Sequence, residues 1–241
     1  MNINISSYGK GFPIVFLHGW GFDSRVWLPL VLKLSMEYQL ILIDLPGFGH
    51  SPIMNWDSFK TFLLSQLPPQ FALVGWSMGG LYAIRFALEE PERVHSLINV
   101  TSSPRFLQTD RWPGVSQDVF KKFYKKLLQE PKGTLNEFME LNGLTIHDRV
   151  QHLPNKLPSP EGLKLGLEIL EEWDLREELK QFAKPTCFMF GRLDPIVSIK
   201  TMSSMQLSYP KFHYILFKRA AHMPFLSHID LFIEEIRGFI Q

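Results

Sequence analysis

The segment from Phe71 to Leu81, FALVGWSMGGL, constrains this chain more than any other stretch. An apolar run typical of a β-strand leads directly into GWSMG at 75–79, and a helix-forming sequence follows. This is a G-x-S-x-G pattern in strand–turn–helix context, the context of a nucleophile elbow. Glycines are needed beside such a turn because side chains would collide where the strand doubles back. The segment therefore predicts an exposed, reactive serine, Ser77, at the end of a strand.

Further apolar runs predict the other strands of the sheet that surrounds Ser77. Short continuous apolar runs, typical of strands buried on both faces, are followed by helical patterns. These runs lie at 14–17, 40–43, 96–100, 186–190 and 214–217. Strands that alternate with helices predict an α/β fold with a mostly parallel, doubly wound sheet. Ligands of such sheets bind at the carboxyl ends of strands, and Ser77 follows one of these ends.

The middle of the chain has a different pattern, because β-type runs disappear and amphipathic helices take their place. We expect helices near 118–129, 134–142 and 159–173. We interpret residues 104–173 as a helical cap inserted late in the chain, and residues 1–103 and 174–241 as the core.

Two further residues complete a candidate catalytic set with Ser77. A serine hydroxyl is a poor nucleophile until a base takes its proton. In this architecture the acid follows the serine in the chain, and the histidine follows the acid. Asp194 lies just after a predicted strand, and among eight histidines only His222 lies in the loop after the final strand. We predict His222 as the base and Asp194 as the group that orients its ring.

Backbone N–H groups are expected to stabilise the negative charge that forms during the reaction. The loop after the strand at 14–17 reads HGWG, and its Trp20 would supply one N–H, while Met78 after the serine would supply the other. The expected reaction is acyl transfer to water through a covalent acyl-serine, which requires no metal and no organic cofactor. We interpret His18 and Asp44 as structural, because both precede the serine.

Composition excludes several other classes of function. The formal net charge of +1 gives no general attraction to nucleic acid or to membranes. The first residues lack the pattern of a signal peptide or a spanning helix. Cys187 is the only cysteine and cannot form an internal disulfide, which fits a reducing compartment. We expect a cytoplasmic monomer.

The predicted helix at 118–129 carries a local basic excess. Its lysines, together with Lys132, give five positive charges against Asp118 and Glu130. They are Lys121, Lys122, Lys125 and Lys126. The cluster is either an ordinary solvated helix face or a docking surface for an acidic partner.

Several longer motifs run through almost the whole chain. They are LHGWGFDSRVW at 17–27, DLPGFGHS at 44–51, GWSMGGL at 75–81, PERV at 91–94, SSPRF at 102–106, WPG at 112–114, GLEIL at 166–170, DLR at 174–176 and AAHMPFLSH at 220–228. On these motifs the chain resembles the α/β-hydrolase superfamily throughout. More narrowly, it resembles the pimeloyl-acyl-carrier-protein methyl ester esterase family of biotin synthesis.

The resemblance implies roles for particular residues. Ser77, Asp194 and His222 would form the triad, and Trp20 and Met78 would contact the acyl carbonyl. The cap segment FMELN would line the acyl chain, that is Phe138, Met139, Glu140, Leu141 and Asn142. The implied reaction hydrolyses the methyl ester of pimeloyl-acyl-carrier protein, with the acyl-carrier protein as partner.

The sequence departs from the family at the carrier-docking region of the cap. The family binds its carrier through arginines, whereas this chain has Lys132, Glu137 and Arg149 there. We hypothesise that the lysines at 121–126 take over part of this role.

Two other functions use the same fold. A broad short-chain carboxylesterase or thioesterase would have the same triad and depend only weakly on the carrier. A non-catalytic ligand-binding member of the fold would be expected to lack a triad residue or to turn over very slowly. The serine at the elbow, in place of aspartate, argues against a dehalogenase or an epoxide hydrolase.

Overall fold

The computed structural model describes residues 2–141 and 158–240, which contain a seven-stranded sheet in the order β1-β3-β2-β4-β5-β6-β7. The strands are β1 (Ile5–Tyr8), β2 (Phe12–Leu17), β3 (Tyr38–Ile43), β4 (Phe71–Trp76), β5 (Val94–Val100), β6 (Thr186–Gly191) and β7 (His213–Phe217). All neighbours pair in parallel except β1, which pairs antiparallel to β3. The predicted α/β fold with a mostly parallel sheet is confirmed. The sequence analysis missed β1, because its ISSY sequence is a half-exposed edge strand without an apolar run.

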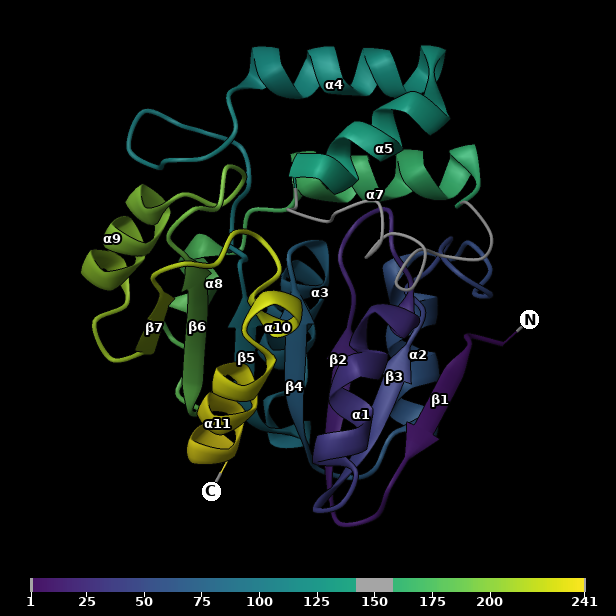
Figure 1. Cartoon of the computed structure of the whole chain (residues 1–241), viewed down its shortest axis with the longest axis vertical. Helices are drawn as coiled ribbons and strands as arrows, with labels where there is room; N and C mark the ends of the chain where they lie inside the picture. Colours follow the sequence, from purple (N-terminus) through teal and green to yellow (C-terminus); the bar gives the residue numbers. More distant parts are fainter. Residues whose placement is uncertain (1, 142–157, 241) are drawn as a thin grey trace.

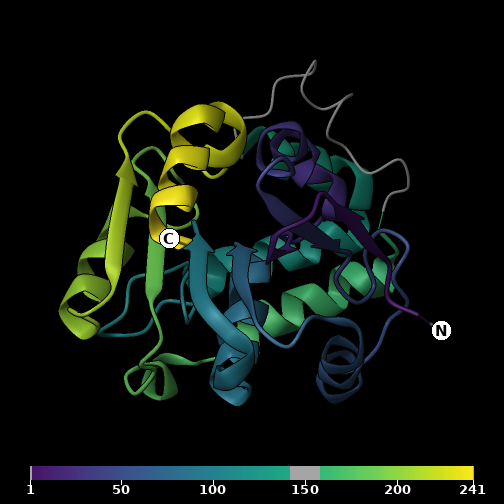
Figure 2. The same cartoon turned by 90° about the horizontal axis from the view of Figure 1, so that it is seen from below.

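Helices cover both faces of the sheet, as Figures 1 and 2 show from two directions. On one face lie α2 (Trp56–Gln66), α3 (Met78–Glu89), α8 (Arg176–Leu179) and α9 (Ile199–Ser208). On the other face lie α1 (Leu28–Leu34), α10 (Pro224–Ser227) and α11 (Ile229–Ile240). Two short 3-10 helices occupy Ser24–Trp27 and Pro91–Arg93. No helix within the described residues is both long enough and apolar enough to cross a bilayer.

The sheet separates two apolar cores, and successive side chains of β2 pack alternately into one core and the other. Val15 and Leu17 pack into the core beneath α2 and α3, whereas Ile14 and Phe16 pack into the core beneath α1 and α11. All four side chains are at most 1% exposed. A strand covered on both faces reads as a continuous apolar run, which explains why the central strands could be found from sequence.

Three helices between β5 and β6 lie over the edge of the sheet where Ser77 is found, and we call them the cap helices (Figure 1). They are α4 (Gln117–Gln129), α5 (Pro131–Leu141) and α7 (Pro160–Glu172). The serines before α4 and α7 accept a hydrogen bond from the backbone of the first turn, as N-caps do. The second helix begins three residues earlier than predicted, because proline is well tolerated at a first helical position. The cap boundaries at 104 and 173 remain a prediction.

The turn at Ser77 is held by close backbone packing. Ser77 has φ 54° and ψ −118°, a conformation that non-glycine residues rarely adopt. A Cβ at Gly75 would lie 2.4 Å from the carbonyl oxygen of Gly79. A Cβ at Gly79 would lie 2.4 Å from the carbonyl oxygen of Leu17 and 2.5 Å from that of His18. Both positions therefore require glycine. At Gly79 the requirement comes from the backbone at the end of β2, and not only from the turn.

We expect Gly79→Ala to lower the free energy of unfolding by about 1–3 kcal/mol, because the new methyl group would overlap backbone atoms that cannot move aside. Gly238→Ala in α11 is a matched control, since nothing lies within 4 Å of a Cβ there. The control should gain up to about 1 kcal/mol from its higher helix propensity. Urea unfolding of both variants measures the two effects. Equal stabilities for the two variants would contradict the packing argument.

Candidate active site

Ser77 occupies the corner between β4 and α3 and is bound to the neighbouring strand. Its N–H donates to the carbonyl of Val100 at 3.0 Å. Its own carbonyl accepts from the N–H of Gly80 at 2.9 Å and from Ser102 Oγ at 2.8 Å. The side chain lines a cavity beneath the cap helices. The backbone is therefore fixed while the hydroxyl faces the cavity.

The structure brings Asp194 and His222 together, as predicted from their positions in the chain. Asp194 follows β6, and its Oδ1 accepts the N–H groups of Ile196 at 2.8 Å and of Val197 at 3.0 Å. Its Oδ2 accepts from His222 Nδ1 at 2.7 Å. His222 is fully buried, and its Nε2 has no hydrogen-bond partner among the described residues. With Nδ1 donating to the carboxylate, Nε2 is left with a lone pair that can accept a proton.

No hydrogen bond joins Ser77 Oγ to His222 Nε2 within the described residues. Catalytic hydrogen bonds are often long without substrate and shorten in the reacting complex. The grouping of Ser77 with His222 and Asp194 as a triad stays a prediction.

The two predicted oxyanion donors lie on neighbouring elements. Trp20 follows β2 and Met78 is the first residue of α3, so its N–H belongs to the unpaired donors at a helix start. In the described part of the chain, neither backbone N–H donates to another group. The Trp20 indole instead reaches the cap, where Nε1 donates to the carbonyl of Leu163 in α7 at 2.9 Å. The loop that carries one oxyanion donor is thereby tied to a cap helix.

His18 and Asp44 have the structural roles predicted for them. His18 Nδ1–H donates to the carbonyl of Gly19 at 2.8 Å, and Nε2 accepts the N–H of Leu45 at 2.9 Å. Asp44 accepts the N–H of Ser24 at 2.8 Å and that of His50 at 2.9 Å. Burial lowers the pKa of His18 below its ordinary value, and the acceptor role of Nε2 also requires a neutral ring. Burial by itself would raise the pKa of Asp44, but the hydrogen bonds that it accepts from Ser24 and His50 hold it below its usual range.

The cavity beside Ser77 has a volume of about 360 Å³ and is walled mainly by apolar side chains. Of the predicted acyl-binding segment, Phe138 and Leu141 line it. Met139 is buried in the core on the α1 and α11 side, Glu140 is exposed, and Asn142 lies outside the described residues. Of the four described residues of the predicted segment, two therefore contribute to the wall.

Other parts of the wall were not predicted, although the sequence carried a signal for them. They come from the motifs SSPRF, WPG and GLEIL, from the residue after WPG and from the start of α4. They include Phe106, Gly114, Val115, Val119, Leu167 and Leu170. Phe120 and Phe123 of α4 also line the cavity, as expected of an aromatic cap that suits an extended apolar chain. Motifs that lie far apart in the chain thus gather around one cavity.

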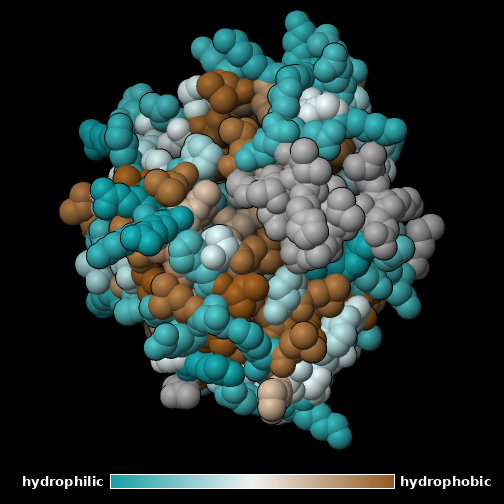
Figure 3. All heavy atoms as spheres, in the orientation of Figure 1, coloured by the Kyte–Doolittle hydropathy of each residue, from teal (hydrophilic) through white to brown (hydrophobic). Residues whose placement is uncertain are grey.

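The lysines of the predicted docking surface differ in their surroundings. Lys121, Lys122 and Lys125 on α4 are exposed, and so is Lys132 on α5. Lys126 is paired with Glu137 of α5 at 2.5 Å, so its charge is largely compensated within the cap. Arg149 lies outside the described residues. Figure 3 shows that the outer edge of the cap, over α4, is hydrophilic.

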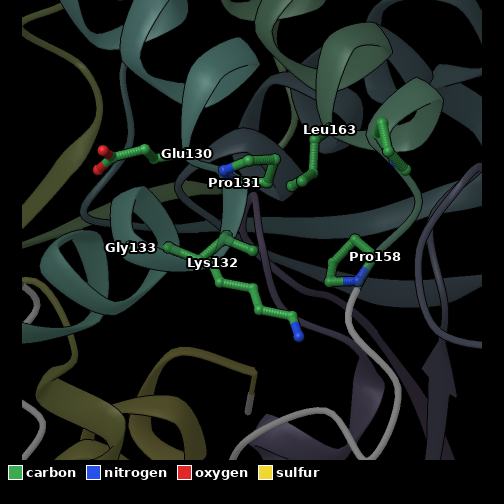
Figure 4. A pocket seen from close by; sticks show the side chains of 8 residues that line it. Glu130, Pro131, Lys132, Gly133, Pro158 and Leu163 are labelled. Atoms are coloured by element: carbon green, nitrogen blue, oxygen red, sulfur yellow. The ribbon is translucent and has the colours of Figure 1, made fainter.

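A second hollow of about 550 Å³ lies between the start of α5 and the start of α7 (Figure 4). Its wall includes Glu130, Lys132, Leu135, Pro158 and Leu163, and it contains neither Ser77 nor Trp20. In Figure 4 the carboxylate of Glu130 points away from the other labelled residues.

A mostly parallel sheet with an elbow after β4 and helices inserted between β5 and β6 defines the α/β hydrolase class. A family model described as alpha/beta hydrolase fold matches residues 13–229. An esterase from Exiguobacterium antarcticum has a similar structure, with a TM-score of 0.90 at 23% identity, covering 99% of this chain and 95% of that chain. This likeness shows the fold alone.

Sequence relatives narrow the class. The pimeloyl-[acyl-carrier protein] methyl ester esterase of Legionella pneumophila (strain Corby) is 56% identical over 243 residues, covering 100% of both chains. The enzyme of that name from Aeromonas salmonicida (strain A449) is 36% identical over 253 residues, again covering 100% of both chains. The chain therefore belongs to the family of these α/β-hydrolase esterases.

We expect the buried His18 to make stability depend on pH. Because burial lowers its pKa in the folded state, the unfolded chain binds more protons below about pH 6.5, and stability falls as pH decreases. The slope from this one group is at most about 1.4 kcal/mol per pH unit. His18→Gln keeps an acceptor for Leu45 but removes the titration. Urea unfolding between pH 5 and pH 8 should give a flatter dependence for the variant, and parallel curves would refute the assignment.

Proposed function

We propose that this chain is a serine carboxylesterase that hydrolyses the methyl ester of pimeloyl-[acyl-carrier protein], releasing methanol and pimeloyl-[acyl-carrier protein] in biotin biosynthesis. We propose that it acts as a cytoplasmic monomer. The observation that supports the proposal is the buried Asp194–His222 pair, whose Nε2 has no partner among the described residues, in a chain whose elbow serine lines an apolar cavity. Full-length identity of 56% to the Legionella esterase supports the choice of substrate.

In the proposed reaction Ser77 Oγ attacks the carbonyl carbon of the methyl ester. His222 Nε2 takes the hydroxyl proton, and Asp194 stabilises the imidazolium that forms. The N–H groups of Trp20 and Met78 stabilise the oxyanion, each by about 3–4 kcal/mol. His222 then gives its proton to the departing methoxide, and methanol leaves an acyl-serine. A water molecule, deprotonated by His222, releases the free carboxylate and restores Ser77.

The cavity supports selection of the methyl ester over the thioester of the same substrate. The thioester is intrinsically the more labile bond, so the enzyme must select by position. An apolar wall of cap residues suits an extended methylene chain with its uncharged ester end at Ser77. Hydrolysis converts that end into a carboxylate, which is costly to keep in an apolar cavity and so favours product release.

We expect kcat/KM for the carrier-bound methyl ester to exceed that for free dimethyl pimelate by a wide margin. The carrier holds the chain in register with Ser77, whereas the free diester has no such constraint. Ser77→Ala should reduce both activities by about 10³-fold or more. Equal or better turnover of the free diester would reduce the assignment to a general carboxylesterase with the same machinery.

The exposed lysines of α4 are proposed to dock the acidic carrier. Lys122→Glu combined with Lys125→Glu should raise KM for the carrier-bound ester about 10-fold and leave kcat/KM for dimethyl pimelate unchanged, because the charges act only on the carrier. Lys211→Glu, an exposed lysine before β7, is the matched control. The effect should weaken as salt concentration rises. An unchanged KM in the double variant would exclude docking at this face.

A further inference from the structure

The backbone carbonyl of His222 accepts two side-chain hydrogen bonds that the reaction scheme above does not use. Trp76 Nε1 donates to it at 2.8 Å, and Thr101 Oγ1 donates to it at 2.8 Å. All three residues are fully buried. His222 lies between β7 and α10, outside any helix or strand, so its position depends on contacts of this kind.

Thr101 is an unexpected residue for its backbone conformation. Its φ is 42°, in the left-handed region that a β-branched residue seldom adopts. A glycine or an asparagine would meet that requirement with less strain. Threonine adds a hydroxyl, which reaches the His222 carbonyl, while its N–H donates to the carbonyl of Met189 at 2.7 Å. The hydrogen bond to His222 therefore accounts for a threonine in an unfavourable position.

The two donors come from the strand ends that also hold the nucleophile. Trp76 directly precedes Ser77 at the end of β4. Thr101 directly follows Val100, whose carbonyl accepts the N–H of Ser77 at 3.0 Å. The main chain of the proposed base is thus connected to the main chain of the proposed nucleophile through neighbouring residues. The Asp194 bond fixes one edge of the imidazole ring, and the carbonyl contacts fix the point from which the ring projects.

We propose that Thr101 is a positioning residue which, together with Trp76, fixes the main chain of His222 so that Nε2 is directed at Ser77. The proposal rests on the serine chemistry of the proposed function, but it does not depend on which ester is the substrate. Misplacement of a reacting group by about 1 Å can cost as much as 100-fold in rate, so a contact that fixes the base is expected to act on kcat.

Three variants test the positioning role. Thr101→Val keeps the size and branching of the side chain and loses the donor, whereas Thr101→Ser keeps the donor. Thr186→Val is the matched control, because Thr186 is buried at the start of β6 and its Oγ1 donates to a backbone carbonyl, that of Lys184, at 2.9 Å. Each variant is assayed well below its melting temperature, with a p-nitrophenyl ester and with a fluorophosphonate that labels Ser77.

We expect Thr101→Val to lower kcat for the p-nitrophenyl ester and the rate of labelling by about 10-fold or more, with little change in KM. Thr101→Ser should restore most of the rate, and Thr186→Val should keep the wild-type rate. Wild-type kcat and labelling in Thr101→Val, or an equal loss in both valine variants, would overturn the proposal. Failure of the wild-type enzyme on the carrier-bound ester would instead overturn the proposed substrate and leave this comparison valid.

Discussion

The contact between Gly79 and the end of β2 is the constraint on which the rest of the site depends. The start of α3 approaches the carbonyls of Leu17 and His18 so closely that no side chain fits between them. This approach brings the first N–H of α3 beside the loop that follows β2. The nucleophile, the helix start and the Trp20 loop are therefore assembled by backbone packing. Strain at Ser77 persists because the surrounding sheet and helix over-determine its position.

A buried polar network surrounds that backbone assembly. The Asp194 carboxylate, the His222 ring and the His222 carbonyl are each engaged by hydrogen bonds of 2.7–3.0 Å. Buried polar groups are costly unless they are paired, so a network this complete holds its members in one arrangement. His222 Nε2 is the member without a partner in the part of the chain that the structure describes. A buried nitrogen without a partner is costly for stability, and it is what a base needs in order to accept a proton from a serine.

The cap and the core meet through aromatic side chains rather than through charge. Trp20, from the core, packs edge-on against Phe123 of α4 and Phe138 of α5, with ring centroids 5.4 and 5.1 Å apart. A Cβ at Gly166 of α7 would lie 2.5 Å from the Trp20 ring, so the third cap helix also approaches it closely. One residue thus offers a backbone donor to the reaction and an apolar surface to the cap. The exposed lysines of α4, Lys121, Lys122 and Lys125, lie apart from these aromatic contacts.

The sequence alone determined the central strands of the sheet and the elbow, because both leave a local signal, and it predicted Asp194 and His222 from chain order. Continuous apolar runs mark strands that are buried on both faces, and chain order separates Asp194 and His222 from the structural Asp44 and His18. The half-exposed strand β1 left no such signal. Only the tertiary structure decided what depends on residues far apart in the chain. Phe106, Leu167 and Leu170 share one cavity wall, Lys126 is compensated by Glu137, and Thr101 reaches the carbonyl of His222. Periodicity reports which face of an element is buried, but it carries no information about which distant side chain meets that face.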